Sequence, residues 1–259
     1  MTRSAARSGT AIGSRKASPG ILDAWEPGPH RPRLASGSVH VWRADLRCVG
    51  DEVLASLCAE ERERAARFPH ERDGLLWARA RGVLRGLIGR YLDVEPSTVQ
   101  FRLEGHGKPS LWRPVTSPPL SFNLSHSGPL ALYAFSQAGS VGVDVQSTRA
   151  RRANEPAIAA RALGAQEGRR LAGLRPPERE PEFLRAWARV EATLKCAGAG
   201  LWARGRANGG AARRSHGRQP WVIELAVGGR AAAALAVQTR PQEVRCLTVV
   251  SSRLERRIG

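Results

Sequence analysis

Cysteine is scarce in this 259-residue sequence, and its four cysteines show no CxxC spacing: Cys48, Cys58, Cys196 and Cys246. Their scattered positions argue against a zinc site or a disulfide framework and fit a reducing, cytoplasmic compartment. No apolar run reaches the length of a membrane span. Residues 1–36 carry basic residues without an apolar stretch. We therefore expect a flexible basic extension there, not a secretory signal.

Lysine is almost missing. Only Lys16, Lys108 and Lys195 occur, so 38 of the 41 basic residues are arginine (41 minus 3). Lysine and arginine are not interchangeable at a compact phosphate contact, so each lysine is worth attention. The sequence also lacks a Walker motif, a GxGxxG–helix unit, HExxH and GxSxG. These absences argue against the nucleotide-binding proteins, metalloproteases and hydrolases that carry these motifs.

Acidic residues are too few to balance the arginines, and the formal net charge is +18. Such a charge attracts polyanions, which include nucleic acid, phosphorylated small molecules and acidic proteins. Aromatic residues make up 5% of the chain. Because nucleic-acid-binding modules combine basic with aromatic patches, a nucleic-acid-binding protein is the less favoured alternative.

The hydrophobic pattern predicts an α+β protein with two similar-sized lobes, residues 37–140 and residues 141–259. Apolar periodicity predicts helices over 51–68, 71–92 and 155–174, and from about Pro181 to the glycine stop at Gly198. Strands are expected over 39–46 and 98–104, and in three segments between 221 and 250. A turn is expected at GHGKPSLW, and residues 203–218 form a basic loop.

Residues 121–146 predict three strands joined by two turns, with Asn123 and residues 125–127 at the first turn. Asp144 alternates with valines on the last strand. A carboxylate among apolar neighbours is costly unless it is paired, hydrogen-bonded or bound to a metal. Asp144 is therefore the first candidate for a functional group.

Glu191 could share a hard divalent ion with Asp144, because Mg²⁺ is typically held by one or two carboxylates plus water and phosphates. Lys195 follows one helical turn later and would lie beside the same phosphates, whereas His126 and Lys108, in the other lobe, could hold a further phosphate. Taken singly, structural explanations are favoured: a helical Glu191–Lys195 ion pair, a satisfied turn histidine and a turn-capping aspartate.

The arginines of the 71–92 helix, Arg79, Arg81 and Arg85, leave two alternatives open. They form a solvated face, or Arg81 or the nearby Arg64 points at a bound phosphate.

Four motifs occur in order: GKP (107–109), FNLSHS (122–127), GVDV (142–145) and WARVEATLKCAGAGL (187–201). Together with EERERAARFPHERD (60–73), they resemble the 4′-phosphopantetheinyl transferases of the Sfp type. The similarity extends over roughly residues 39–201. It implies two α+β lobes related by pseudo-twofold symmetry, with coenzyme A (CoA) between them.

The resemblance also implies a reaction, the transfer of 4′-phosphopantetheine from CoA to a serine of an acyl or peptidyl carrier protein. Adenosine 3′,5′-bisphosphate would be released. Asp144 and Glu191 would bind Mg²⁺, or alternatively Mn²⁺, and Glu191 would be the base for the serine. Lys195 would neutralise the pyrophosphate, so the catalytic set is Glu191, Lys195 and Asp144. The CoA-binding residues implied, besides Lys195, are Arg64, Lys108, Pro109, Ser125 and His126.

Two positions depart from the family pattern. Gln146 stands where many members have a second strand glutamate, which leaves two carboxylates and an optional amide ligand. Val190 replaces the lysine that usually precedes the helix glutamate. These departures suggest a further alternative, a pseudoenzyme that only binds carrier protein. As an enzyme, the chain is expected to be a monomer that binds acidic carrier proteins through its basic surface, including the 203–218 loop.

Overall fold

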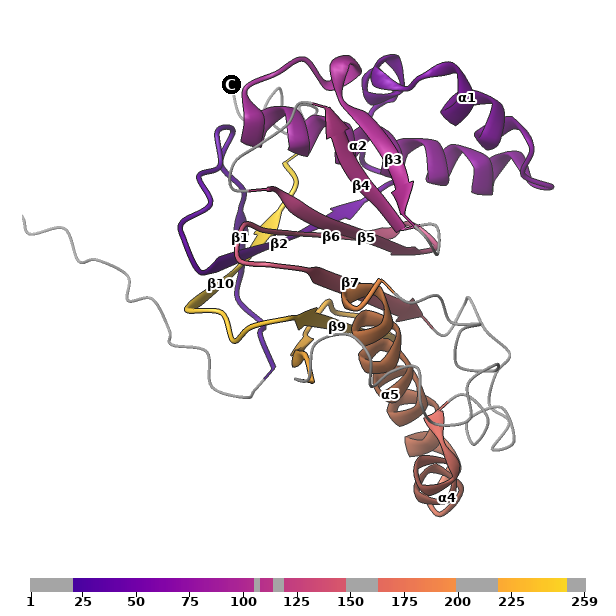
Figure 1. Cartoon of the computed structure of the whole chain (residues 1–259). Helices are drawn as coiled ribbons and strands as arrows, with labels where there is room; N and C mark the ends of the chain where they lie inside the picture. The colour runs from indigo at the N-terminus through magenta and orange to yellow at the C-terminus, as the bar shows by residue number, and fades with distance from the viewer. Residues whose placement is uncertain (1–20, 105–107, 114–118, 148–162, 199–218, 251–259) are drawn as a thin grey trace, which may run out of the picture.

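The computed structural model describes residues 21–104, 108–113, 119–147, 163–198 and 219–250 (Figure 1). The helical elements are η1 (Asp51–Ser56), α1 (Ala59–Ala66), α2 (Glu71–Leu92), η2 (Pro96–Thr98), α4 (Ala165–Ala172) and α5 (Pro176–Cys196). The strands are β1 (Trp25–Pro27), β2 (Ser38–Asp45), β3 (Gln100–Glu104), β4 (Lys108–Arg113), β5 (Ser121–Ser127), β6 (Leu130–Ser136), β7 (Val141–Ser147), β8 (Trp221–Leu225), β9 (Ala231–Val237) and β10 (Glu243–Thr248). The predicted α+β class is confirmed, and the basic loop 203–218 lies outside the described residues.

Two sheets pack face to face, and each carries a long helix on its outer face (Figure 1). The valines of β7 meet Leu132 and Ala134 of β6 in the core between the sheets. On the far side of β6, Tyr133 and Phe135 pack against α2. On the far side of the second sheet, α5 lies on alanines of β9. Strand alternation thus supplies both faces of each sheet with apolar side chains.

The five-stranded sheet has the order β1-β10-β2-β6-β5, and the three-stranded sheet has the order β7-β9-β8. Strand β10 pairs in parallel with both β1 and β2, although it comes from the end of the chain. The predicted division into lobes at residue 140 stays a prediction. Strand β10, from the second predicted lobe, pairs with β2 of the first. A separate ribbon of β3 and β4 completes the sheets.

The predicted helix over 51–68 is wrong in one respect, because η1 and α1 are separate and Leu57 and Cys58 lie between them. Cys58 is the N-cap residue of α1, and its backbone N–H donates to Glu61 Oε2 over 3.3 Å. A glutamate at this position satisfies a helix-end amide, which favours a new helix start.

The arginines of α2 do not form the expected solvated face, and a phosphate at Arg81 or Arg64 stays a prediction. Arg81 and Arg85 both donate to the buried carboxylate of Glu61, over 2.6 and 2.7 Å. Arg79 pairs with Asp51 over 2.8 Å. These arginines therefore tie α2 to α1 and η1, and the ion pairs of Arg81 and Arg85 are buried where a solvated face was expected.

Helix α5 begins at Pro176, not near Pro181 as expected. Proline is well tolerated at the first helical positions, where the backbone N–H has no intrahelical acceptor. Pro181, inside the helix, cannot donate a backbone hydrogen bond, and its ring crowds the carbonyl group of the preceding turn. The helix ends where predicted, because Gly198 adopts a positive φ of 67° just beyond its last turn.

Within the described part of the chain, every helix is too short or too polar to cross a membrane.

A polar cluster lies in the core under α2. Tyr91 Oη accepts from Trp42 Nε1 over 2.8 Å and lies 2.7 Å from His40 Nδ1. The hydroxyl can accept from the indole and donate its own proton to Nδ1, an arrangement that suits a neutral His40 ring. Burial, with the charge of Arg245, lowers the pKa of His40 from 6.5 to about 4.

This buried histidine predicts a loss of stability in acid. Between pH 6.5 and about 4 the unfolded chain binds a proton at His40 that the folded protein does not, so stability falls as the pH falls through this window. The shift corresponds to about 3 kcal/mol at the lower limit. We expect the free energy of urea unfolding to depend less on pH in His40→Gln than in the parent. The exposed His30→Gln is the control, and an equal pH dependence in all three proteins would contradict the prediction.

Candidate functional site

Strand β5 of the first sheet and strand β7 of the second are joined by hydrogen bonds from side chains to backbone. Successive residues of β5 point to opposite faces, so alternate positions, beginning with Asn123, face the edge of β7. Three oxygens of β5 accept from backbone N–H groups of β7: Asn123 Oδ1 from Val143 at 2.9 Å, Ser125 Oγ from Val145 at 3.3 Å and Ser127 Oγ from Ser147 at 3.1 Å. This row of bonds, the β5–β7 seam, places the FNLSHS and GVDV motifs side by side.

The expected turn at Asn123 and residues 125–127 is therefore wrong, because these residues lie within β5. The turn comes after them, at Gly128, which adopts a positive φ of 57°. Lys108 and Pro109 likewise belong to β4 and not to a turn.

Carbonyl groups of the same β7 edge are held by two lysines. Lys108 Nζ donates to Val141 O over 3.0 Å, and Lys195 Nζ donates to Val143 O over 3.2 Å. The two carbonyls belong to alternate residues and so point the same way. The edge of β7 is thus satisfied largely by side chains from β4, β5 and α5.

Asp144 is 2% exposed and lies at the centre of this arrangement. Its Oδ1 accepts from Lys195 Nζ at 2.6 Å and from Ser125 Oγ at 2.8 Å, and its Oδ2 accepts from Gln146 Nε2 at 2.7 Å. Pairing and hydrogen bonding offset the cost of burying the carboxylate. The turn-cap explanation for Asp144 is wrong, because the residue lies inside β7.

Glu191 lies on α5, one turn before Lys195, and is half-buried. The i, i+4 spacing puts both residues on one face of the helix. Since the side chain of Lys195 reaches Asp144, this face is turned toward β7. The side chain of Lys195 is 28% exposed, so part of it is in contact with solvent.

Because Gly142 has no side chain, the backbone of α5 packs directly against the backbone of β7. A Cβ atom added there would lie 2.2 Å from Ala192 O and 2.4 Å from Cys196 N. Contacts this short require the helix to move, so Gly142 sets the separation between the strand of Asp144 and the helix of Lys195.

We therefore expect Gly142→Ala to lower the free energy of unfolding by about 1–3 kcal/mol, the usual cost of overpacking. Chemical denaturation measures this loss. The matched control is Gly86→Ala in α2, where no atom lies within 4 Å of the added methyl group. Alanine is the better helix former, so the control should be neutral or slightly stabilising. Equal stability of the two variants would refute the close-contact argument.

His126 lies on the other face of β5 from Ser125. Among the described residues, its Nδ1 atom is buried without a hydrogen-bond partner. Burial, with the charge of Lys195, lowers the pKa of His126. A backbone hydrogen bond with Gly128 and the charge of Asp73, near the start of α2, act on this pKa in the opposite direction. A buried nitrogen without a partner is costly, and a ligand atom would satisfy it.

The remaining predicted CoA-binding residues lie apart from one another. The guanidinium of Arg64 lies over the ring of Trp77, 5.2 Å from its centroid. Pro109 pairs with Leu103 in the β3–β4 ribbon. Ser125 belongs to the Asp144 cluster, whereas His126 faces the α2 side of the sheet.

The side chains around Asp144 fit a magnesium ion shared with a phosphate. The described residues hold no group of three His, Cys, Asp or Glu side chains that could bind a metal alone. Asp144, however, already holds a cation, the Lys195 ammonium, on one oxygen. Glu191 supplies a second carboxylate nearby, and the Gln146 amide would present its oxygen after half a turn. Mg²⁺ in proteins often has one or two carboxylates, with the other ligands from water and substrate phosphates.

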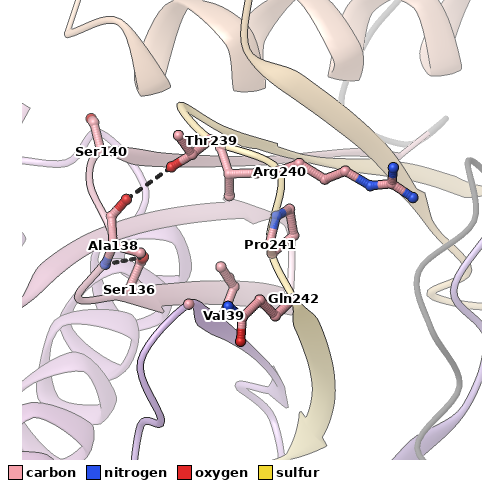
Figure 2. Close-up of a pocket in the computed structure, with 10 residues that line it drawn as sticks. Val39, Ser136, Ala138, Ser140, Thr239, Arg240, Pro241 and Gln242 are labelled. Atoms are coloured by element: carbon pink, nitrogen blue, oxygen red, sulfur yellow. Dashed lines mark hydrogen bonds between the residues drawn. The ribbon is translucent and has the colours of Figure 1, made fainter.

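A small cavity of about 120 Å³ lies elsewhere, where the ends of β2, β6 and β9 meet (Figure 2). Ser136, Ser140 and Thr239 contribute to its lining, and the Arg240 side chain points away from the other labelled residues. Asp144, Glu191 and His126 do not line it. Ligand pockets usually measure about 300–1,000 Å³, so this cavity is too small for a dinucleotide-sized ligand.

Sequence reasoning missed Ser140 and Gly142, and assigned Asn123 and Ser127 to a turn. The alternation of Asn, Ser and Ser at 123, 125 and 127 is the signal that could have revealed a polar strand face. Ser140 has no such signal, because its Oγ bonds the carbonyl of Cys196, which is distant in sequence.

Comparison with known proteins gives matches along most of the described chain. A family model for the N-terminal part of 4′-phosphopantetheinyl transferase matches residues 42–138, and one for the 4′-phosphopantetheinyl transferase superfamily matches residues 140–232. The 4′-phosphopantetheinyl transferase HetI of Nostoc sp. is 35% identical over 180 residues, which cover 68% of this chain and 76% of that protein. The 4′-phosphopantetheinyl transferase Sfp of Bacillus subtilis is 26% identical over 151 residues, 58% of this chain and 64% of that protein.

Proposed function

Because this chain belongs to the 4′-phosphopantetheinyl transferase superfamily, we propose that it transfers 4′-phosphopantetheine from CoA to a serine hydroxyl of a carrier protein with Mg²⁺ as cofactor. The observation that carries the proposal is the buried Asp144, bound to Lys195 at a seam between two motifs of that family. Transferase activity is supported by the relatives. The metal, the site residues and the acidic nature of the carrier are the proposed parts.

In the reaction, the serine oxygen forms a bond to the phosphorus that bears pantetheine, and the bond from that phosphorus to the bridging oxygen breaks. Adenosine 3′,5′-bisphosphate leaves with the electron pair. Glu191 takes the serine proton, directly or through one water, since its carboxylate lies on the α5 face turned toward β7. Lys195 Nζ, which bonds Asp144 Oδ1, stabilises negative charge on the phosphates.

A magnesium ion, when bound by Asp144 and Glu191, supplies charge stabilisation at the pyrophosphate. Gln146 orients the Asp144 carboxylate through its Nε2 hydrogen bond of 2.7 Å. This second role does not require Gln146 to be a ligand.

CoA itself is proposed to bind through Ser125, His126, Pro109, Arg64 and Lys195. The unpartnered Nδ1 of His126 supports a phosphate on the α2 side of β5. Arg64, stacked on Trp77, supplies a charge there that is already oriented. The pyrophosphate would lie on the Asp144 side, so the nucleotide would extend from one side of β5 to the other.

The partner is proposed to be an acidic acyl or peptidyl carrier protein in the cytoplasm, with the transferase acting as a monomer. The net charge of +18 supports an acidic partner, because opposite charges speed encounter and make it sensitive to salt.

The test mixes the full chain with CoA, Mg²⁺ and an apo carrier protein, and measures the intact mass of the carrier. Gain of one phosphopantetheine group, prevented by a metal chelator or by omission of CoA, is the expected result. A stable complex with carrier without an adduct would favour the pseudoenzyme suggested by Gln146 and Val190. Tight binding of DNA or RNA without carrier would favour the nucleic-acid alternative.

A further inference from the structure

The last turn of α5 ends against the turn between β6 and β7. The final carbonyl groups of a helix have no intrahelical donor and need partners from outside. Lys195 O accepts from Lys108 Nζ over 2.8 Å, and Cys196 O accepts from Ser140 Oγ over 2.5 Å. Two side chains from outside the helix therefore hold the turn that carries Lys195.

Lys108 does more than cap the helix. Its ammonium also donates to Ser140 Oγ over 3.2 Å and to Val141 O over 3.0 Å. An ammonium group has three donors, and these three acceptors come from the β6–β7 turn, the start of β7 and the end of α5. Lys108, from β4, thus joins three other segments at one point.

The position also suits a cation electrostatically. The carbonyl end of a helix carries partial negative charge, and a partly buried cation there stabilises the helix end. Lysine is favoured because three donors around one nitrogen can reach acceptors in different directions, whereas the planar arginine fork cannot.

We propose that Lys108 is a positioning residue for the transfer reaction, and that it acts through α5 and not as a ligand of a CoA phosphate. By holding Lys195 O and Val141 O together, it fixes the last turn of α5 on β7. This inference rests on the function proposed above, and it departs from the role for Lys108 that the family resemblance implied.

The two lysines link β4 to Asp144 of β7 in two steps. Lys108 holds the main chain of Lys195, and the side chain of Lys195 reaches Asp144 Oδ1 over 2.6 Å. Releasing the main chain would let Lys195 and Glu191 shift relative to Asp144. A misplacement of about 1 Å at reacting groups can cost on the order of 10²-fold in rate.

The test is Lys108→Met, which keeps an apolar stem and removes the ammonium. We expect kcat to fall on the order of 10- to 10²-fold, while KM for CoA and the calorimetric Kd for CoA change by a smaller factor than kcat. A phosphate ligand would behave in the opposite way. A raised Kd and KM for CoA with kcat retained would overturn the inference.

The second variant is Ser140→Ala, which keeps Lys108 but removes the bond to Cys196 O and one Lys108 acceptor. It should also lower kcat with KM for CoA unchanged, and its effect should be less than additive with Lys108→Met because both act on one turn. Unchanged kcat in Ser140→Ala would count against the proposal, and this variant carries the test where Lys108→Met does not fold.

Arg102→Met is the matched charge control. It removes one positive charge from the same β3–β4 ribbon, at a guanidinium that lies over Trp112. Both kinetic constants should be unchanged in it, and a loss of kcat equal to that of Lys108→Met would overturn the positioning role. Absence of an adduct with the parent protein would instead refute the proposed function itself.

Discussion

Replacing Asp144 by asparagine is expected to lower the rate of phosphopantetheine transfer by about 10³-fold, the upper range for removal of one electrostatic group from an active site. The charge is lost from the centre of the site, while the side chain keeps its shape and one oxygen. Ser125 and Lys195 can still donate to that oxygen, so the β5–β7 seam should persist. Carrier mass against time measures the rate, and circular dichroism with urea unfolding checks the fold.

The matched control for this variant is Asp45→Asn at the end of β2. Asp45 is also a strand carboxylate with a basic partner, Arg47, but its pair is exposed. Transfer by the control should equal that of the parent. A folded Asp144→Asn that keeps more than about a tenth of the parental rate is inconsistent with Asp144 as a catalytic and metal-binding group.

Replacing Glu191 by glutamine should lower the transfer rate by about 10²- to 10⁴-fold, the usual contribution of a general base. Glutamine keeps an oxygen at the same place but cannot accept the serine proton at neutral pH. Binding of CoA should be nearly unchanged, because Lys195, Ser125 and His126 are intact. Single-turnover rates at saturating CoA report the chemical step, and calorimetry reports the affinity for CoA.

Glu224→Gln is the control for Glu191. The carboxylate of Glu224 pairs with Arg189, which is also on α5, so the control changes an ion pair of the same helix, two strands from Asp144 in the β7-β9-β8 sheet. Its transfer rate should match the parent. If Glu191→Gln and Glu224→Gln have the same rate, Glu191 is not the base.

Local patterns predicted the elements whose apolar residues repeat regularly. The strand around Asp144, the helix 71–92 and the stop of α5 at Gly198 needed only alternation, helical periodicity and glycine chemistry. Segments rich in polar residues were misplaced. Asn123, Ser125 and Ser127 were assigned to a turn because polar residues favour turns locally, whereas their partners are N–H groups of a strand about twenty residues later.

The candidate site was drawn from four motifs, and the structure brings together only part of the predicted set. Asp144, Ser125, Gln146 and Lys195 form one cluster. Arg64 and His126 lie on the α2 side of β5, and Lys108 bonds protein oxygens. Motif order cannot show which face of a strand a residue occupies without the strand's true register, and it cannot show that a lysine is already occupied by the protein. The roles of these residues stay predictions.

Strand β10 makes the order of the strands in the first sheet differ from their order along the chain. The first sheet receives β2, β5 and β6 early in translation, but the place between β1 and β2 is filled only by residues 243–248. Until then, one edge of β2 exposes unpaired N–H and C=O groups, which invite pairing with other chains. The first half, expressed alone, would keep that open edge. Although separate family models match the two halves, the first sheet is completed only by β10, and this long-range pairing predicts slow folding.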